Sequence, residues 1–146
     1  MQMLGKLHMR RQTFANEWQP RILSVLRLVT ALLLLQHPLV KFFSFPVPFP
    51  YPMTPLLNVA GGLELVGGVL LLLGLFTRPV AFVLSGEMAV AYFMGHATRG
   101  FYPIANMGNV AILYCFIFLY LAVAGGGEWS VDALRNRRPV KTISDR

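Results

Sequence analysis

Four apolar runs alternate with short polar or proline-rich segments along this chain of 146 residues. Each run holds about 18 to 22 residues, the length that an α-helix needs to cross the roughly 30 Å hydrocarbon layer of a bilayer. The pattern predicts an all-α integral membrane protein, folded as an antiparallel four-helix bundle. The expected spans are residues 22–43, 55–76, 79–97 and 107–124.

The segments between the runs predict how the spans are connected. Residues 44–55 contain five prolines, which cannot continue a helix because proline lacks an amide hydrogen and clashes with the preceding turn. We therefore expect an extended, aromatic-rich loop at the membrane surface. The tripeptide Thr77-Arg78-Pro79 predicts a tight turn that makes a hairpin of the second and third spans, and residues 98–106 make the last connection.

Composition and charge support the membrane assignment. The chain is 55% hydrophobic and only 13% charged, whereas about a quarter of the residues of a typical soluble domain are charged. Its net charge of +7 does not indicate nucleic-acid binding, because the basic residues gather at the two ends of the chain beside apolar spans. They are placed to contact the anionic headgroups of the lipid bilayer.

Lysine and arginine are unevenly divided between the two predicted sides of the membrane. Under the positive-inside rule both termini are cytoplasmic and the proline-rich loop faces outward. Residues 1–21 then form a basic cytoplasmic segment that could fold as an interfacial helix, residues 22–132 the membrane domain, and residues 133–146 a basic tail. The predicted inner side carries Lys6, Arg10, Arg11, Arg21, Arg78, Arg135, Arg137, Arg138, Lys141 and Arg146, and the outer side Lys41 and Arg99.

Ionisable side chains inside the apolar runs are the candidate functional residues. A charge in the bilayer costs several kcal/mol unless it is paired or neutralised, so these groups should face the bundle interior. Small residues on the same helix faces would let neighbouring helices approach closely. The polar candidates are Arg27, His37, Lys41, Glu64, Glu87 and His96, and the packing candidates are Gly61, Gly67, Gly68, Gly74, Ala91 and Gly95.

Depth in the membrane leaves several pairings of these charges open. Arg27 could pair with Glu87 in the inner half, His37 with Glu64 in the outer half, or the two glutamates could share a proton. Such pairs could also serve only to fix helix register. His96 is expected to anchor the end of its span, and its pairing with His37 as haem ligands is a remote alternative. The sequence contains no Cys/His set with metal-binding spacing.

Four strings of residues, in this order and spacing, resemble the DoxX family of small four-span membrane proteins over roughly residues 21–132. The resemblance marks several charged and small residues as family positions. Pro38 departs from it where a glycine commonly follows the histidine, and should bend or break the first helix; Asn109 departs where an acidic residue often opens the last span. The strings are RILSVLRLVTALLLLQHPLVKFF, GGLELVGGVLLLLGLFTRPVA, MAVAYFMGH and GGGEWSVD, and the family positions are Arg27, His37, Lys41, Glu64, Gly68, Gly74, Arg78, His96, Trp129, Ser130 and Asp132.

The resemblance implies a place in membrane redox complexes and quinone handling in the bacterial inner membrane. The leading hypothesis is an integral subunit or partner of a quinone-linked redox system, with the quinone headgroup near Glu64, His37 and Arg27. Such a chain would act as an oxidoreductase component together with partner proteins, or as a homo-oligomer. The alternatives are a non-enzymatic carrier of lipids or small molecules, a membrane scaffold whose aromatic loop 45–51 is a contact surface, and a haem-binding subunit.

Overall fold

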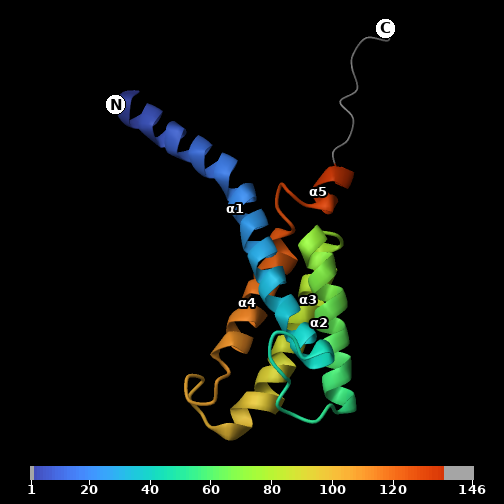
Figure 1. Cartoon of the computed structure of the whole chain (residues 1–146). Coiled ribbons are helices and arrows are strands. Elements are labelled where there is room, and N and C mark those ends of the chain that lie inside the picture. The colour runs from blue at the N-terminus through green and yellow to red at the C-terminus, as the bar shows by residue number, and fades with distance from the viewer. Residues whose placement is uncertain (1, 137–146) are drawn as a thin grey trace.

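The computed structural model describes residues 2–136 of the chain, with side chains from residue 16 onward, and within that range it contains helices and loops but no strands (Figure 1). The all-α prediction is therefore confirmed for the described residues. The third long helix continues through a π-helical turn, η1, into a short 3₁₀ turn, η2. The elements are α1 (Gln2–Phe43), α2 (Pro55–Leu73), α3 (Thr77–Ala91), η1 (Tyr92–His96), η2 (Ala97–Arg99), α4 (Asn109–Ala124) and α5 (Val131–Asn136).

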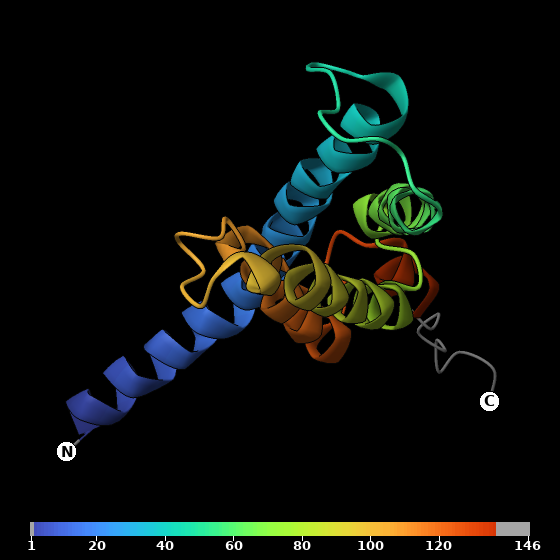
Figure 2. The same cartoon turned by 90° about the horizontal axis from the view of Figure 1, so that it is seen from below.

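The four long helices pack side by side, and successive helices run in opposite directions (Figures 1 and 2). The helices α3 and α4 form one closely packed pair, and α1 and α2 form another. Contacts between α2 and α3 join the two pairs. The α2–α3 turn and α5 lie at one end of the bundle, called here the terminal end. The loops 44–54 and 100–108 lie at the other, called here the loop end. The N-terminal part of α1 extends beyond the bundle at the terminal end.

Three helical segments are long and apolar enough to cross a membrane: Asn16–Phe43, Pro55–Leu73 and Thr77–Arg99. The helix α4 is apolar but has only 16 residues, or about 24 Å at 1.5 Å per residue. The chain is therefore a membrane protein, and the fourth crossing remains a prediction. A small core of interdigitated side chains, including Leu34, Leu84 and Phe118, lies between the helices.

The helix ends differ from the predicted boundaries for local reasons. The helix α2 ends three residues early because Gly74 adopts the left-handed conformation, with φ of 67°, which glycine accepts without steric cost. The hairpin turn is therefore residues 74–76, and the turn predicted at Thr77-Arg78-Pro79 is wrong. Those residues form the first turn of α3, where proline needs no hydrogen-bond partner.

The two prolines of α1 do not end it. The helix runs through Pro20 and Pro38 to Phe43. Of the predicted bend or break at Pro38, the break is therefore wrong. The same helix carries the basic N-terminal segment, whose backbone is helical and continuous with the first span. A proline inside a helix removes one backbone hydrogen bond, and in the interior of a membrane protein such a gap is tolerated when neighbouring helices cover it. Pro38 is buried, consistent with that cover.

Candidate functional site

Glycines bring α2 close to both of its neighbours, and Glu64 lies on that glycine face. Gly61, Gly67 and Gly68 are buried together with Glu64. A Cβ atom at Gly68 would lie 2.7 Å from Leu35 Cδ2 on α1, and one at Gly67 would lie 2.9 Å from Leu84 Cδ1 on α3. Because the helices approach this closely, only 4% of Glu64 is exposed. The carboxylate faces protein, away from the acyl chains.

Glu64 forms an ion pair with Lys41 across the α1–α2 contact. The Lys41 Nζ atom donates to Glu64 Oε2 at 2.5 Å, and the two side chains are 11% and 6% exposed. A charge-assisted hydrogen bond in such a shielded place is far stronger than one at a wet surface. The predicted partner of Glu64, His37, does not form this bond. Lysine one turn further along α1 takes that place.

Glu87 of α3 adds a second carboxyl group to the same site. It interacts electrostatically with both Glu64 and Lys41. Its Oε2 atom is buried and has no hydrogen-bond partner among the described residues. The predicted pairing of Glu87 with Arg27 is wrong, whereas the predicted proximity of the two glutamates agrees with their interaction. Two carboxyl groups thus share the field of a single ammonium group.

His37 and Tyr114 line the same region from α1 and α4. Their rings meet edge to face, with centroids 6.1 Å apart, and both interact electrostatically with Glu64. Tyr114 is buried, whereas His37 is exposed on the outer surface of the bundle. The five residues Lys41, Glu64, Glu87, His37 and Tyr114 are called here the polar cluster. Its buried charges therefore adjoin a polar side chain that is accessible from outside the helices.

Arg27 lies outside the polar cluster and joins three parts of the chain at the terminal end. Its guanidinium is fully buried. Nη1 donates to the carbonyl oxygens of Leu71 and, at 2.7 Å, Leu72 at the end of α2. Nε donates to Gly126 O at 2.8 Å, and Nη2 to Trp129 O at 2.7 Å. The side chain thus adds hydrogen bonds to carbonyls at the end of α2 and in the segment after α4, in a low-dielectric setting.

The segment that follows α4 is fixed to the α2–α3 turn by Asp132. Its two carboxylate oxygens accept hydrogen bonds from the backbone N–H groups of Phe76 and Thr77, at 2.9 and 2.8 Å. Burial tends to raise the pKa of Asp132, but these hydrogen bonds and the charge of Arg135 outweigh it and hold the pKa below its ordinary value. The sequence marked Asp132 only through the family resemblance. Its role as a cap for α3 was missed because it comes from 55 residues away.

The remaining candidates have local roles or none that the geometry shows. His96 Nδ1 lies 3.0 Å from Asn106 O, so the ring ties the end of η1 to the following loop, in line with the expected anchor. Gly74 meets Ser130, since a Cβ there would lie 2.5 Å from Ser130 Cβ. Ala91 is half-buried, and a Cβ at Gly95 would meet nothing within 4 Å. Gly95 therefore provides no close helix approach.

Ser130 caps the start of α5, because its Oγ atom accepts a hydrogen bond from the N–H of Ala133 at 3.1 Å. The same hydroxyl donates to Gly127 O at 2.8 Å. The glycines of this segment, residues 125–127, are needed where the chain passes other atoms closely. A Cβ at Gly127 would lie 2.3 Å from Ser24 Oγ. The segment therefore packs directly on α1.

The structure is that of a small helical membrane protein with buried charged groups. An ion pair joins two of its apolar helices, and a buried arginine bonds to backbone carbonyls. The DoxX family model matches residues 22–97. The chain belongs to the DoxX family. This stretch contains each residue of the polar cluster except Tyr114, and it also contains Arg27.

Two proteins of Haemophilus influenzae, both described as uncharacterized, are similar to this chain. One is 45% identical, over 80% of this chain and 92% of its own length. The other is 33% identical, over 60% of each, so the chain spans less than two thirds of that second relative. No solved structure matches the chain.

Proposed function

We propose that this protein is an integral subunit or partner of a quinone-linked redox system in the bacterial inner membrane. In this proposal the polar cluster receives the headgroup of a quinone, and partner proteins supply the electrons. The family membership and the homologues from Haemophilus influenzae support a bacterial membrane setting. The redox role itself rests on the chemistry of the cluster.

The observation that carries the proposal is the buried carboxyl oxygen of Glu87 without a partner. A buried polar atom that makes no hydrogen bond costs about 1 to 3 kcal/mol, so a native protein keeps one where something else can bind to it. Glu87 interacts electrostatically with both members of the Lys41–Glu64 pair. A ligand that reaches Glu87 therefore also meets a cation and a second carboxyl group.

The residues of the cluster suit a headgroup that takes up protons. Quinone reduction consumes two protons in a site that water does not reach freely, and positioned acids supply them. Lys41, Glu87 and His37 can each hold or release a proton, and the Tyr114 hydroxyl can donate a hydrogen bond. When bound, the quinone supplies the electron-accepting carbonyls. The protein positions donors and excludes bulk water.

The exposure of His37 gives this site access from the surrounding membrane. Its side chain lies at the bundle surface next to buried Tyr114. A lipid-soluble molecule can therefore approach between α1 and α4 with its apolar tail still among acyl chains. This arrangement fits a quinone better than a water-soluble substrate, because the headgroup alone needs to enter the polar region.

The test is binding of ubiquinone and menaquinone to the purified full chain in detergent, measured by equilibrium dialysis with mass spectrometry of the bound fraction. We expect one of the two to bind, and Glu64→Gln and Glu87→Gln to weaken its binding by about tenfold, equal to 1.4 kcal/mol. Glu128→Gln is the matched control, since Glu128 pairs with Arg21 at the terminal end. Binding of neither quinone, or equal binding by all variants, would overturn the proposal.

A second candidate function, a non-enzymatic carrier or scaffold, is favoured by the loop between α1 and α2. Phe45, Val47, Tyr51 and Met53 are all exposed there, at the same end of the bundle as the polar cluster. Exposed apolar groups gathered in one loop suit contact with a partner protein or a lipid. Co-purification of a stable partner or bound lipid, without quinone, would support this function and count against the redox role.

A further inference from the structure

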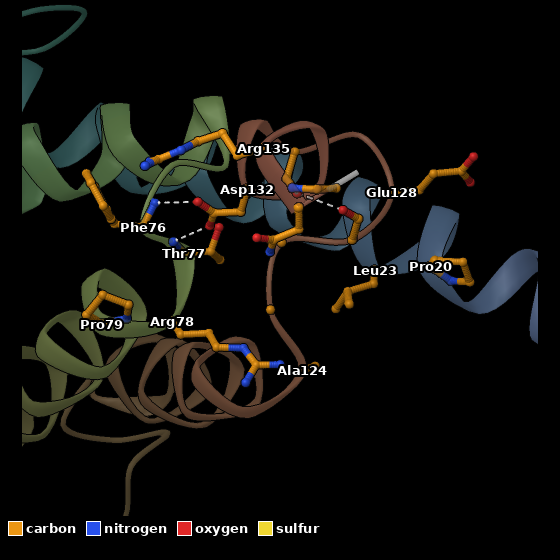
Figure 3. A pocket seen from close by; sticks show the side chains of 16 residues that line it. Pro20, Leu23, Phe76, Thr77, Arg78, Pro79, Ala124, Glu128, Asp132 and Arg135 are labelled. Carbon is orange, nitrogen blue, oxygen red and sulfur yellow. Dashed lines mark hydrogen bonds between the residues drawn. The ribbon is translucent and has the colours of Figure 1, made fainter. Parts of the chain in front are cut away.

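An open cavity of about 800 Å³ lies at the terminal end, outside the polar cluster (Figure 3). It is bordered by the start of α1's spanning part, the α2–α3 turn, the first turn of α3 and residues 124–136. Its lining includes two arginines, Arg78 and Arg135. Figure 3 shows them on opposite sides of Asp132, with Arg78 reaching toward Ala124.

The acidic groups of this cavity are already engaged. Both oxygens of Asp132 accept backbone hydrogen bonds from Phe76 and Thr77. Glu128 Oε2 accepts from Arg21 Nε at 3.1 Å. Both carboxyl groups therefore already have hydrogen-bond donors, whereas the donors of the two arginines remain available.

The arginines, in contrast, have donors to spare. Arg78 is exposed, passes along Gly125, where a Cβ would lie 3.5 Å from its Nε, and forms neither an ion pair nor a hydrogen bond with any residue that the structure describes. The guanidinium of Arg135 stacks over the Phe76 ring, 5.4 Å from the centroid. It interacts electrostatically with Asp132 but forms no direct ion pair with it. A guanidinium has five donors in a planar fork that matches phosphate oxygens.

The rest of the lining adds an apolar wall and one buried hydroxyl. Leu23, Pro79 and Ala124 contribute apolar surface. Thr77 also lines the cavity and is fully buried. The cavity lies where the apolar helices end. In the predicted orientation that level is the headgroup layer of the cytoplasmic leaflet, which is rich in anionic lipid.

We infer that this cavity binds a phosphate-bearing anion at the membrane interface, with the guanidinium of Arg78 as the main ligand and that of Arg135 as the second. The phosphate is carried either by an anionic phospholipid, whose glycerol and acyl groups lie along the apolar wall, or by a small soluble phosphate compound. The inference is independent of the proposed redox function, because the site lies at the opposite end of the bundle from the polar cluster.

The test is native mass spectrometry of the full chain in mixed micelles containing phosphatidylglycerol or phosphatidylcholine, with and without inorganic phosphate. We expect preferential retention of phosphatidylglycerol and a loss of about tenfold in affinity in Arg78→Gln, as expected for removal of a charged hydrogen-bonding group. Arg99→Gln is the matched control, since Arg99 is an exposed arginine at the loop end. Displacement of the lipid by millimolar phosphate assigns the site to soluble phosphates, and retention assigns it to the lipid.

Arg78 has no partner within the described residues, so Arg78→Gln should keep the thermal stability of the unaltered protein. Arg78→Lys is the second variant, in which the charge remains but the fork is lost, and its affinity should fall between the other two. Two results together would overturn the inference. The first is equal retention of phosphatidylglycerol by Arg78→Gln and Arg99→Gln. The second is inorganic phosphate binding that does not change in Arg78→Gln.

Discussion

The ammonium group of Lys41 lies 2.5 Å from Glu64 Oε2 and joins α1 to α2 in the interior of the bundle. Both side chains are almost fully shielded, so neither charge can turn to water when its partner is removed. A buried pair of this kind is costly to break from one side, whereas exchange of both partners for apolar residues is far less costly.

We therefore expect Lys41→Met and Glu64→Leu to lower the free energy of unfolding by about 3 kcal/mol each, and the double variant to lose much less than the sum. Unfolding in detergent, followed by circular dichroism, measures the coupling. The pair Arg21–Glu128, whose side chains are 44% and 37% exposed, is the control and should couple by about 1 kcal/mol or less. Additive losses at Lys41 and Glu64 would show that the ion pair does not act as a unit.

Arg27 should be the residue whose replacement most damages the fold. Its guanidinium donates to carbonyls of α2 and of the segment after α4, and its removal takes away all of these hydrogen bonds at once. We expect Arg27→Gln to cost about 3 kcal/mol or more, measured as loss of monodisperse protein on heating. Arg27→Lys should be intermediate, because an ammonium group cannot span acceptors on both sides. Stability equal to the unaltered protein in either variant would contradict this role.

The capping of α3 by Asp132 predicts a pH-dependent part of the stability. The folded-state pKa of Asp132 lies below the ordinary value of 3.8. The charged cap therefore contributes in full above that value, and its contribution is lost as the pH falls through the folded-state pKa. We expect Asp132→Ala to cost about 1 kcal/mol at pH 7, with the difference from the unaltered protein narrowing below pH 3.8. If the loss of unfolding free energy in Asp132→Ala is the same at pH 7 as below pH 3.8, the charged cap is ruled out.

The predicted orientation can be checked with cysteine labelling, because Cys115 is the single cysteine of the chain. In a Cys115→Ala background, Val47→Cys lies in the exposed loop at the loop end and Asn136→Cys at the exposed end of α5. A membrane-impermeant maleimide should label position 47 in intact spheroplasts and position 136 only after permeabilisation. The opposite pattern would invert the topology. Labelling of both positions in intact spheroplasts would place them on the same side, with an even number of crossings between residues 47 and 136.

Hydropathy and helical periodicity were enough to predict the main helices and the buried face of α2. Both depend on local spacing: apolar runs set the helix lengths, and about 100° per residue places Gly61, Glu64 and Gly68 on one side. The exact ends of the helices could not be predicted from hydropathy. The early stop at Gly74 follows from its left-handed backbone, and the π-helical turn at Tyr92–His96 has no signature in hydropathy.

The charge pairings were beyond the reach of sequence because depth along the helix axis does not give rotation about it. His37 and Lys41 are four residues apart on the same side of α1, and only the packed structure shows that Lys41 reaches Glu64. Arg27 was harder still, since its acceptors are backbone carbonyls, which every residue has. Their position depends on the return of residues 126–129 to α1, a long-range contact that no local pattern specifies.

The hydrogen bonds of Arg27 also have a consequence for the synthesis and folding of the protein. Gly126, one of its acceptors, follows it by 99 residues, which the ribosome adds in roughly 5 to 20 seconds at about 5–20 residues per second. Leu71 and Leu72, its acceptors in α2, follow it by only 44 and 45 residues, so the arginine is partly but not fully hydrogen-bonded during that interval. The first span can therefore reach its full set of contacts only after α4 and the segment that follows it have been synthesised.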